Sequence, residues 1–142
     1  MANFTMQQMV SFQHCDPAGL IFYVNYFHLG FQVMENWFME GLGLPHGEMV
    51  VKQKIGVPTV HIEADFLAPS RLEEVLDFSL QITRLGQSSV TMQIDGHHQG
   101  EHRCRIKQVI VFVDLNFEEI KNIPIPQDIR ARMQKFVGPD EE

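Results

Sequence analysis

The stretch FHLGFQVMENWFMEG, residues 27–41, decides the fold. Within it, apolar residues and glycines recur at the three- and four-residue intervals of one helix face: Phe27, Gly30, Phe31, Met34, Phe38 and Gly41. A helix with so much apolar surface cannot lie with one side fully in water, so we expect a sheet wrapped around it. Gly30 would let the helix backbone approach that sheet closely. The glycines and proline of GLGLP, residues 41–45, predict where the helix ends.

Alternating apolar and polar residues predict the strands that follow the helix. The clearest alternation covers residues 60–66, and further strands are expected at 76–83, 90–94 and 104–113. An early strand near residues 4–12 precedes the helix. Ile129, Met133 and Phe136 have the spacing of a terminal amphipathic helix. We therefore predict one α+β domain, residues 1–142, in which a mainly antiparallel sheet wraps around one long central helix, with a C-terminal surface helix.

Composition narrows the class of protein. With 142 residues and 44% hydrophobic content, the chain has the common size of one domain that builds a core without disulfides. Neither a leader segment nor a run of about 18 apolar residues is present, so a cytoplasmic location is expected. The net charge of −7 argues against binding to nucleic acid or to an anionic membrane. Cys15 and Cys104 lack the spacing of a zinc site and are expected to be free thiols.

The stretch HCDPAG, residues 14–19, precedes the helix and carries the candidate chemistry. Pro17 favours an extended Asp16, and Gly19 permits a sharp turn, so the carboxylate lies on a loop. The loop leads into a helix amino terminus near Tyr23, where unpaired N–H groups favour an oxygen that becomes negative during a reaction. The alternative interpretation is a plain turn, in which Asp16 bonds nearby backbone.

Several short motifs resemble the 4-hydroxybenzoyl-CoA thioesterases of the hotdog superfamily, over nearly the whole chain. They are TMQQ at 5–8, CDPAG at 15–19 followed by Tyr23 and Asn25-Tyr26, GLP at 43–45, and VF at 111–112. This resemblance implies a hotdog fold, and the hydrolysis of an acyl-CoA to free acid and CoA without a metal or redox cofactor. It also implies a homodimer or a dimer of dimers. Edge strands left by a sheet around a single helix favour such pairing independently.

The same resemblance assigns roles to individual residues. Asp16 takes the position of the catalytic carboxylate, which either attacks the thioester carbonyl or activates a water. The backbone N–H of Tyr23 takes the position that polarises the thioester oxygen. Asn25 and Tyr26 fall in the same signature and are expected to bind substrate.

A second part of the resemblance concerns the nucleotide of CoA. Ser88 and Ser89 match a turn that contacts the CoA phosphates in the family, and Arg84 is the cation near them. Three alternating cations on a later strand are the alternative, although a charged strand face is most often simply solvated: Arg103, Arg105 and Lys107.

Rival sites receive less support from the residues. The histidines around the predicted hairpin tip, with a cysteine beyond them, fit no established zinc pattern: His97, His98, His102 and Cys104. His14 and Cys15 are adjacent in an extended segment and so point apart, which disfavours a thiolate nucleophile. Paired carboxylates at Glu63 and Asp65 are explained by a solvent-facing strand.

Two alternative functions stay open. One is a non-catalytic acyl-CoA-binding module on the same scaffold. The other is a hotdog-fold dehydratase of 3-hydroxyacyl thioesters, which needs a histidine paired with a carboxylate; His14 is the candidate. The acyl group is expected to be aryl, such as 4-hydroxybenzoyl, or short-chain. Aromatic residues of the loop and helix either line its pocket or form core: Phe22, Tyr23, Tyr26, Phe27, Phe31 and Trp37.

Overall fold

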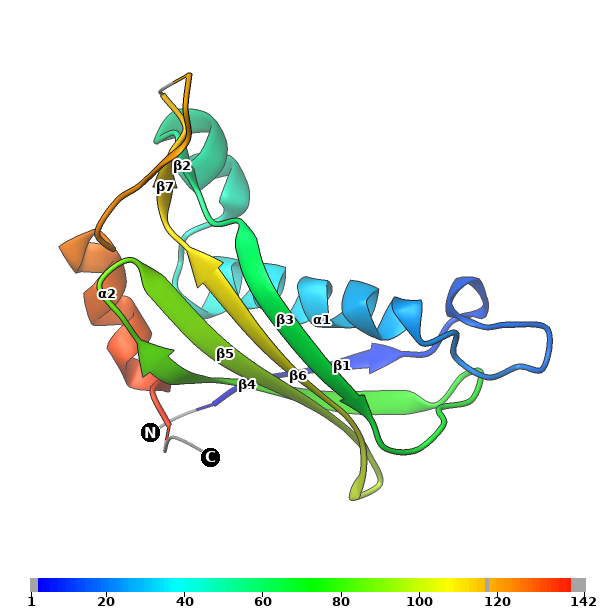
Figure 1. Ribbon diagram of the computed structural model, residues 1–142. Coiled ribbons are helices and arrows are strands. Elements are labelled where there is room, and N and C mark those ends of the chain that lie inside the picture. Colours follow the sequence, from blue (N-terminus) through cyan, green and yellow to red (C-terminus); the bar gives the residue numbers. More distant parts are fainter. Residues whose placement is uncertain (1–2, 117, 139–142) are drawn as a thin grey trace.

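A computed structural model describes residues 3–116 and 118–138. Five antiparallel strands form one sheet in the order β1-β4-β5-β6-β3, and this sheet curves around helix α1, Val24–Asn36 (Figure 1). The strands of this sheet are β1 Phe4–Met9, β3 Thr59–Phe66, β4 Val75–Leu85, β5 Ser89–His98 and β6 Glu101–Val111. The predicted helix inside a mainly antiparallel sheet is confirmed.

Helix α1 continues into a π-helical turn, Trp37–Gly41, in which the Leu42 N–H bonds to the Trp37 carbonyl at 2.9 Å. The helix thus ends in the glycine- and proline-rich segment predicted from the sequence. The face that it buries differs from the predicted stripe, because Phe31 is 52% exposed. Seven other residues form the buried face: Tyr26, Leu29, Gly30, Val33, Met34, Trp37 and Phe38.

Gly30 of α1 packs directly against Ile106 of β6. A Cβ at this position would come within 2.9 Å of Ile106 Cδ1, closer than packed atoms tolerate. The predicted close approach is confirmed. Alternate residues of β4, β5 and β6 supply the sheet side of this core: Leu76, Phe78, Leu80, Ile82, Val90, Met92, Ile94, Cys104, Ile106 and Ile110.

Strand β3 differs from the expectation of a half-buried strand. Val60 is 58% and Phe66 44% exposed, and the register with β6 shifts between Thr59 and His61, on either side of Val60. The reason is position: β3 is the edge of the sheet and pairs only with β6, while α1 packs on β4 and β6. The alternation therefore predicted the strand correctly but overestimated its burial.

Short elements complete the chain beyond this sheet. The turn Gly47–Lys52 is π-helical, and two-residue strands that the sequence did not predict form a second sheet, β2-β7-β8: Ile55–Gly56, Val113–Asp114 and Lys121–Asn122. Helix α2, Gln127–Met133, and a 3-10 turn, Gln134–Phe136, pack on the core as the predicted C-terminal surface helix. None of the helices in the described residues is long and apolar enough to span a membrane.

Candidate functional site

The Asp16 loop folds back on itself at the end of the molecule opposite α2 (Figure 1). Cys15 and Ile21 form an antiparallel bridge, and the Asp16 N–H bonds to the Leu20 carbonyl at 2.8 Å. Gly19 has a φ of +77°, which an L-amino acid with a side chain adopts only with strain. A glycine is therefore needed at this position to close the loop.

The carboxylate of Asp16 is held by the loop's own backbone. Its Oδ1 accepts hydrogen bonds from the N–H of Ala18 at 2.9 Å and from the N–H of Leu20 at 3.3 Å. Among the described residues, none donates to its Oδ2. The carboxylate thus has one oxygen fixed and the other available. Both interpretations of the sequence, turn residue and reactive group, are compatible with this geometry.

A hollow of about 570 Å³ adjoins this carboxylate. Its wall consists of Phe12, Cys15, Asp16, Pro17, Ala18, Gly19 and Leu72. Most of this wall is apolar, so an organic group can lie beside the carboxylate without losing much hydration of polar atoms.

Tyr23 is the N-cap of α1, and its N–H finds no acceptor in residues 3–116 and 118–138. The helix start is tied to the loop through the His14 carbonyl, which accepts from the Phe22 N–H at 2.9 Å and from Asn25 Nδ2 at 2.8 Å. The predicted substrate contact Asn25 therefore braces the loop. The free N–H lies at the positive end of the helix dipole, where a developing negative charge is stabilised.

Tyr26, also a predicted substrate contact, points inward. It is 3% exposed, and its hydroxyl group bonds to Ser70 Oγ at 2.9 Å and donates to the Ala68 carbonyl at 3.3 Å. Burial raises the pKa of the Tyr26 hydroxyl, so the group stays neutral. In this structure, Tyr26 joins the first turn of α1 to the segment that follows β3.

Aromatic rings at the start of α1 gather around Phe66, the last residue of β3. The ring centroids of Tyr23, Tyr26 and Phe27 lie 5.7, 5.4 and 6.0 Å from that of Phe66. Phe22 packs edge-on against Tyr23 at 5.2 Å. Trp37, which the sequence grouped with these rings, lies instead in the core near the other end of the helix.

The predicted CoA contacts Ser88 and Ser89 occupy the β4–β5 turn, and Arg84 is exposed just before it. The turn is closed by a bond from the Gly86 N–H to the Ser89 carbonyl at 2.8 Å. It lies beside α2, at the opposite end of the sheet from Asp16 (Figure 1). One chain therefore does not bring the two halves of the predicted site together.

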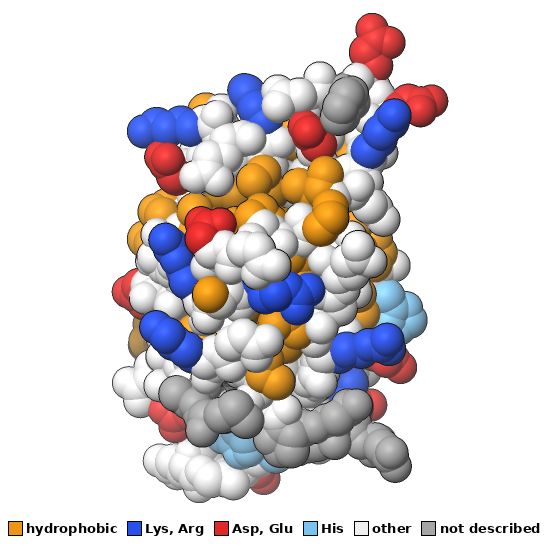
Figure 2. All heavy atoms as spheres, turned by 90° about the vertical axis from the view of Figure 1, so that its left-hand side faces the viewer, with side chains coloured by type: hydrophobic (Ala, Val, Ile, Leu, Met, Phe, Trp, Pro, Cys, Tyr) orange, Lys and Arg blue, Asp and Glu red, His pale blue; other side chains and the backbone are white. Residues whose placement is uncertain are grey.

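Arg130 of α2 is a further cation at this turn, which the sequence did not single out. Its Nη2 donates to the Gly86 carbonyl. Several Lys and Arg side chains lie on the face that carries α2 (Figure 2). The terminal helix was predicted from its apolar spacing. The contact of Arg130 with the β4–β5 turn could not be predicted in this way, because Arg130 and Gly86 are 44 positions apart in the sequence.

Arg103, Arg105 and Lys107 do not form an open cationic face. Arg103 is buried and paired with two carboxylates, and Arg105 Nε donates to Asp95 Oδ1 at 2.8 Å. Lys107 stands opposite Glu63 in the β3–β6 pairing.

The rival histidines do not share a ligand site: the ring of His97 stacks on that of His102 at 4.5 Å, and His98 and His102 have different hydrogen-bond partners. His102 Nε2 lies 2.7 Å from Asp95 Oδ1, and His98 Nδ1 donates to the Val75 carbonyl at 2.8 Å. Burial raises the pKa of the Cys104 thiol to about 12. No group of three or more potential metal ligands converges anywhere in the described part of the chain.

His14 is not paired with Cys15. The Ser11 N–H donates to His14 Nδ1 at 3.0 Å, whereas Cys15 Sγ lies 3.6 Å from the Ser11 carbonyl. Burial, with a smaller contribution from His28, lowers the pKa of the His14 imidazole. The ring therefore stays neutral and accepts a backbone hydrogen bond.

Comparison with known proteins decides the family. The model of the thioesterase-like superfamily matches residues 10–133. The chain belongs to this superfamily. It is 27% identical over 136 residues to the 4-hydroxybenzoyl-CoA thioesterase of Pseudomonas sp. (strain CBS-3). The aligned region covers 89% of this chain and 94% of that relative.

Solved structures of the superfamily agree. The 4-hydroxybenzoyl-CoA thioesterase from the same Pseudomonas strain matches with a TM-score of 0.81 at 26% identity, over 92% of this chain and 98% of that chain. A gentisyl-coenzyme A thioesterase matches with a TM-score of 0.82 at 25% identity, over 92% and 99%. The resemblance seen in the sequence and the hotdog fold are confirmed. Membership of the thioesterase-like superfamily also confirms the predicted class of enzyme, a thioester hydrolase.

Proposed function

We propose that this protein hydrolyses an aryl-CoA thioester to the free acid and CoA, with Asp16 as the reacting carboxylate. The observation that carries the proposal is the environment of Asp16, with one carboxylate oxygen fixed by backbone N–H groups and the other unbonded beside a hollow. The relatives named for 4-hydroxybenzoyl-CoA and gentisyl-CoA support an aryl acyl group.

Two routes are compatible with this environment. In the first, Asp16 Oδ2 attacks the thioester carbonyl, the CoA thiolate leaves, and water hydrolyses the mixed anhydride. In the second, Asp16 takes a proton from a water that attacks the carbonyl directly. In both routes the carbonyl oxygen becomes negative, and the Tyr23 N–H at the start of α1 stabilises it. Such a donor typically lowers the barrier by about 3 to 4 kcal/mol.

The acyl group is proposed to lie against the rings around Phe66. Tyr23 presents both its backbone N–H and an exposed ring at this position. An aromatic acyl group gains edge-to-face contacts there that a short aliphatic acyl group lacks.

We further propose a homodimer in which β3 pairs with β3 of a second copy. The strand is an edge with exposed apolar side chains, among them Val60 and Ile62. Its Thr59 end lies near the β4–β5 turn, because Thr59 and Val90 both pair with Ile110. Its other end carries the rings beside Tyr23.

Antiparallel pairing would set the Thr59 end of one copy beside the Phe66 end of the other. The turn with Ser88 and Ser89 of one copy would then approach the Asp16 end of its partner. Such a dimer unites the two halves of the site, which one chain separates by the eight residues of β3, about 25 Å.

Activity is tested with purified protein and 4-hydroxybenzoyl-CoA, by following the release of free thiol. Asp16→Asn should lower kcat about 10²- to 10⁴-fold while the thermal unfolding temperature is retained. Asp128→Asn, on α2, is the matched control and should hydrolyse at the parental rate. An Asp16→Asn variant as fast as the parent would refute the role of Asp16.

The dimer is tested by size-exclusion chromatography with light scattering. The parent should have twice the mass of one chain at micromolar concentration. Ile62→Asp places a charge on the exposed edge and should yield monomers with much reduced turnover. A monomeric parent with full activity would contradict the shared site.

A further inference from the structure

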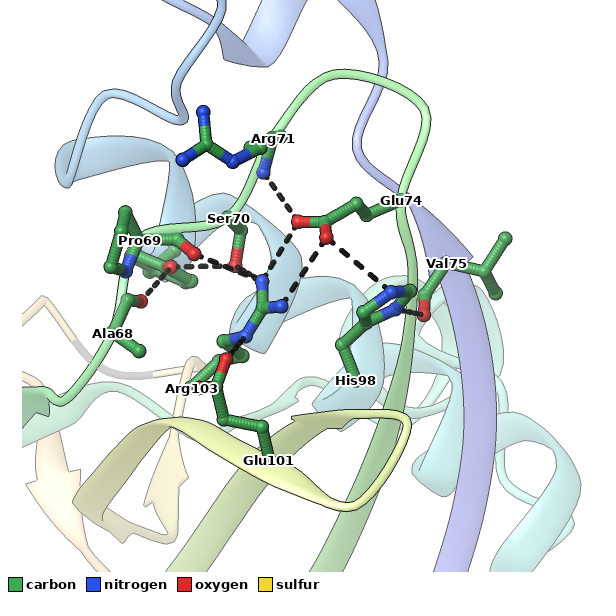
Figure 3. Close-up of polar contacts among 10 residues, drawn as sticks. Ala68, Pro69, Ser70, Arg71, Glu74, Val75, His98, Glu101 and Arg103 are labelled. Carbon is green, nitrogen blue, oxygen red and sulfur yellow. Dashed lines mark hydrogen bonds and ion pairs between the residues drawn. The ribbon is translucent and has the colours of Figure 1, made fainter.

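Arg103 is a buried guanidinium outside the candidate site. It extends from β6, which lies between β5 and β3 in the sheet. Its Nη1 and Nη2 donate to the two carboxylate oxygens of Glu74 at 2.8 and 3.3 Å, and its Nε donates to Glu101 Oε1 at 2.5 Å (Figure 3). With its side chain only 8% exposed, the guanidinium is a fixed point within the sheet.

The same guanidinium holds the segment between β3 and β4. Its Nη1 also donates to the Pro69 carbonyl at 2.9 Å and to Ser70 Oγ at 3.2 Å (Figure 3). Glu74 accepts a further bond from the Arg71 N–H at 2.6 Å. Arg103 and Glu74 therefore fix residues 69–74 at several points.

Residues 69–72 are in turn the support of the Asp16 loop. The Ile21 N–H donates to the Ser70 carbonyl at 2.8 Å, and the Leu72 N–H donates to the Gly19 carbonyl at 3.0 Å. Leu20 and Arg71 form an antiparallel bridge between the same two segments. The Asp16 loop is thus hydrogen-bonded to a segment that Arg103 holds against the sheet.

Ser70 is the residue where these contacts meet. It is fully buried. Its carbonyl holds Ile21 of the loop, while its hydroxyl group contacts both Arg103 and the Tyr26 hydroxyl in the first turn of α1. The two partners of the proposed reaction, the loop that carries Asp16 and the amino terminus of α1, are therefore braced through one residue, the first by its backbone carbonyl and the second by its hydroxyl group.

We propose that Arg103, together with Glu74 and Ser70, is a positioning residue that holds the Asp16 loop and the start of α1 in the geometry for thioester hydrolysis. This proposal rests on the function proposed above. Only a planar guanidinium can donate to Glu74, Glu101 and the Ser70 segment at once, because its five N–H donors form a rigid fork. A lysine keeps the charge but cannot reproduce these directions.

The test combines kinetics with a double-mutant cycle. Arg103→Lys should lower kcat for 4-hydroxybenzoyl-CoA about tenfold or more with little change in KM, since small displacements of reacting groups are costly. In an Asp16→Asn background the same change should have little further effect, because the carboxylate that it positions is gone. Arg132→Lys is the matched control, since Arg132 also donates to a backbone carbonyl, that of Leu42, at the opposite end of the molecule.

Hydrogen exchange provides a readout that does not depend on turnover. The amides of Ile21 and Leu72 should exchange faster in Arg103→Lys and at the parental rate in Arg132→Lys. Should Arg103→Lys fail to fold, Ser70→Ala serves instead, since it removes only the hydroxyl link, and its kcat should fall about threefold or more.

Three results would overturn the proposal. They are unchanged kcat in the variant tested, an equal loss in the parent and in Asp16→Asn, and unchanged exchange at Ile21 and Leu72. A parent protein that hydrolyses no acyl-CoA refutes the proposed function instead, and the exchange measurement then still decides whether Arg103 holds the loop.

Discussion

Two groups of aromatic rings lie near the two ends of the central helix, and they differ in how far they are exposed. Near its carboxyl end, the rings of Phe38 and Phe136 lie 5.2 and 5.7 Å from that of Trp37, which is completely buried. At its amino end, the rings around Phe66 are within similar distances, yet Tyr23 is 55% exposed. Rings at similar distances thus form a buried core at one end of the helix and a partly exposed surface at the other.

The elements around each end explain the difference. Phe136, which follows α2, closes the carboxyl end. The amino end lies beside the edge strand β3, the Asp16 loop and the segment that follows β3, and polar contacts hold it: the Arg103–Glu74 ion pair and the Tyr26–Ser70 hydrogen bond. Apolar packing stabilises the closed end, and directional contacts shape the open end. Substitutions at the closed end should therefore lower mainly stability, and substitutions at the open end should lower mainly activity.

The largest effect is expected from opening the closed end. Phe136→Ala should lower the free energy of unfolding by about 3 kcal/mol, because it leaves a cavity against Trp37. Urea unfolding measures this change. The folded variant should retain the parental kcat, since Asp16 and Tyr23 lie at the other end of the helix. Met39→Ala is the control, because Met39 is an exposed residue in the same helical turn as Trp37. Its free energy of unfolding should stay within about 0.5 kcal/mol of the parent's. A parallel loss of kcat in Phe136→Ala would contradict the separation of the two ends.

A smaller effect, the dependence of the free energy of unfolding on pH, distinguishes the two ends. Arg103 lowers the pKa of the Glu74 carboxyl from 4.5 to about 2. A lowered carboxyl pKa stabilises the folded state above the unfolded pKa, and this contribution is lost as the pH falls towards the folded pKa. Glu74→Gln should therefore lower the free energy of unfolding by about 2 kcal/mol at neutral pH and by much less below about pH 3.

The measurement is urea unfolding of the parent and Glu74→Gln between neutral pH and about pH 2. The destabilisation caused by Phe136→Ala should vary much less over this range, because the change removes no titrating group; the imidazole of His46 packs on Phe38 of the same cluster in both proteins. A Glu74→Gln variant whose stability falls with acid as steeply as the parent's would show that the ion pair does not hold the open end.

The closed end was largely predictable from sequence, because its signals are local. The helix, its glycine-rich stop and the terminal helix all follow from spacing within about 15 residues. The buried face was misjudged at Phe31, because a helix that is apolar almost all round does not specify one stripe. Val33 and Trp37, which are not part of the predicted stripe, lie in the core.

The open end was predictable only in part. The Asp16 turn and the helix start at Tyr23 are local and were found. The exposure of Val60 depends on which strand forms the edge, which spacing along the chain does not determine. The burial of Arg103 depends on Glu74, 29 residues away, so its alternation with Arg105 indicated only a solvated strand. The two-residue strands β2, β7 and β8 are too short to show any periodicity.

The smallest effect on stability is expected at Phe66. Its ring is 44% exposed, so Phe66→Ala should cost only about 1 kcal/mol of unfolding free energy. Its effect on substrate choice should be larger than this number suggests. If the acyl group lies against this ring, kcat/KM should fall about tenfold for 4-hydroxybenzoyl-CoA and change little for acetyl-CoA.

Phe31→Ala is the matched control, because Phe31 is a similarly exposed ring of α1 that lies outside the group around Phe66. Both substrates should be hydrolysed by it at parental rates. An equal fall for both thioesters in Phe66→Ala would mean that the ring supports the helix start rather than the acyl group. The open end would then resemble the closed end, as a packed cluster whose exposure is incidental to binding.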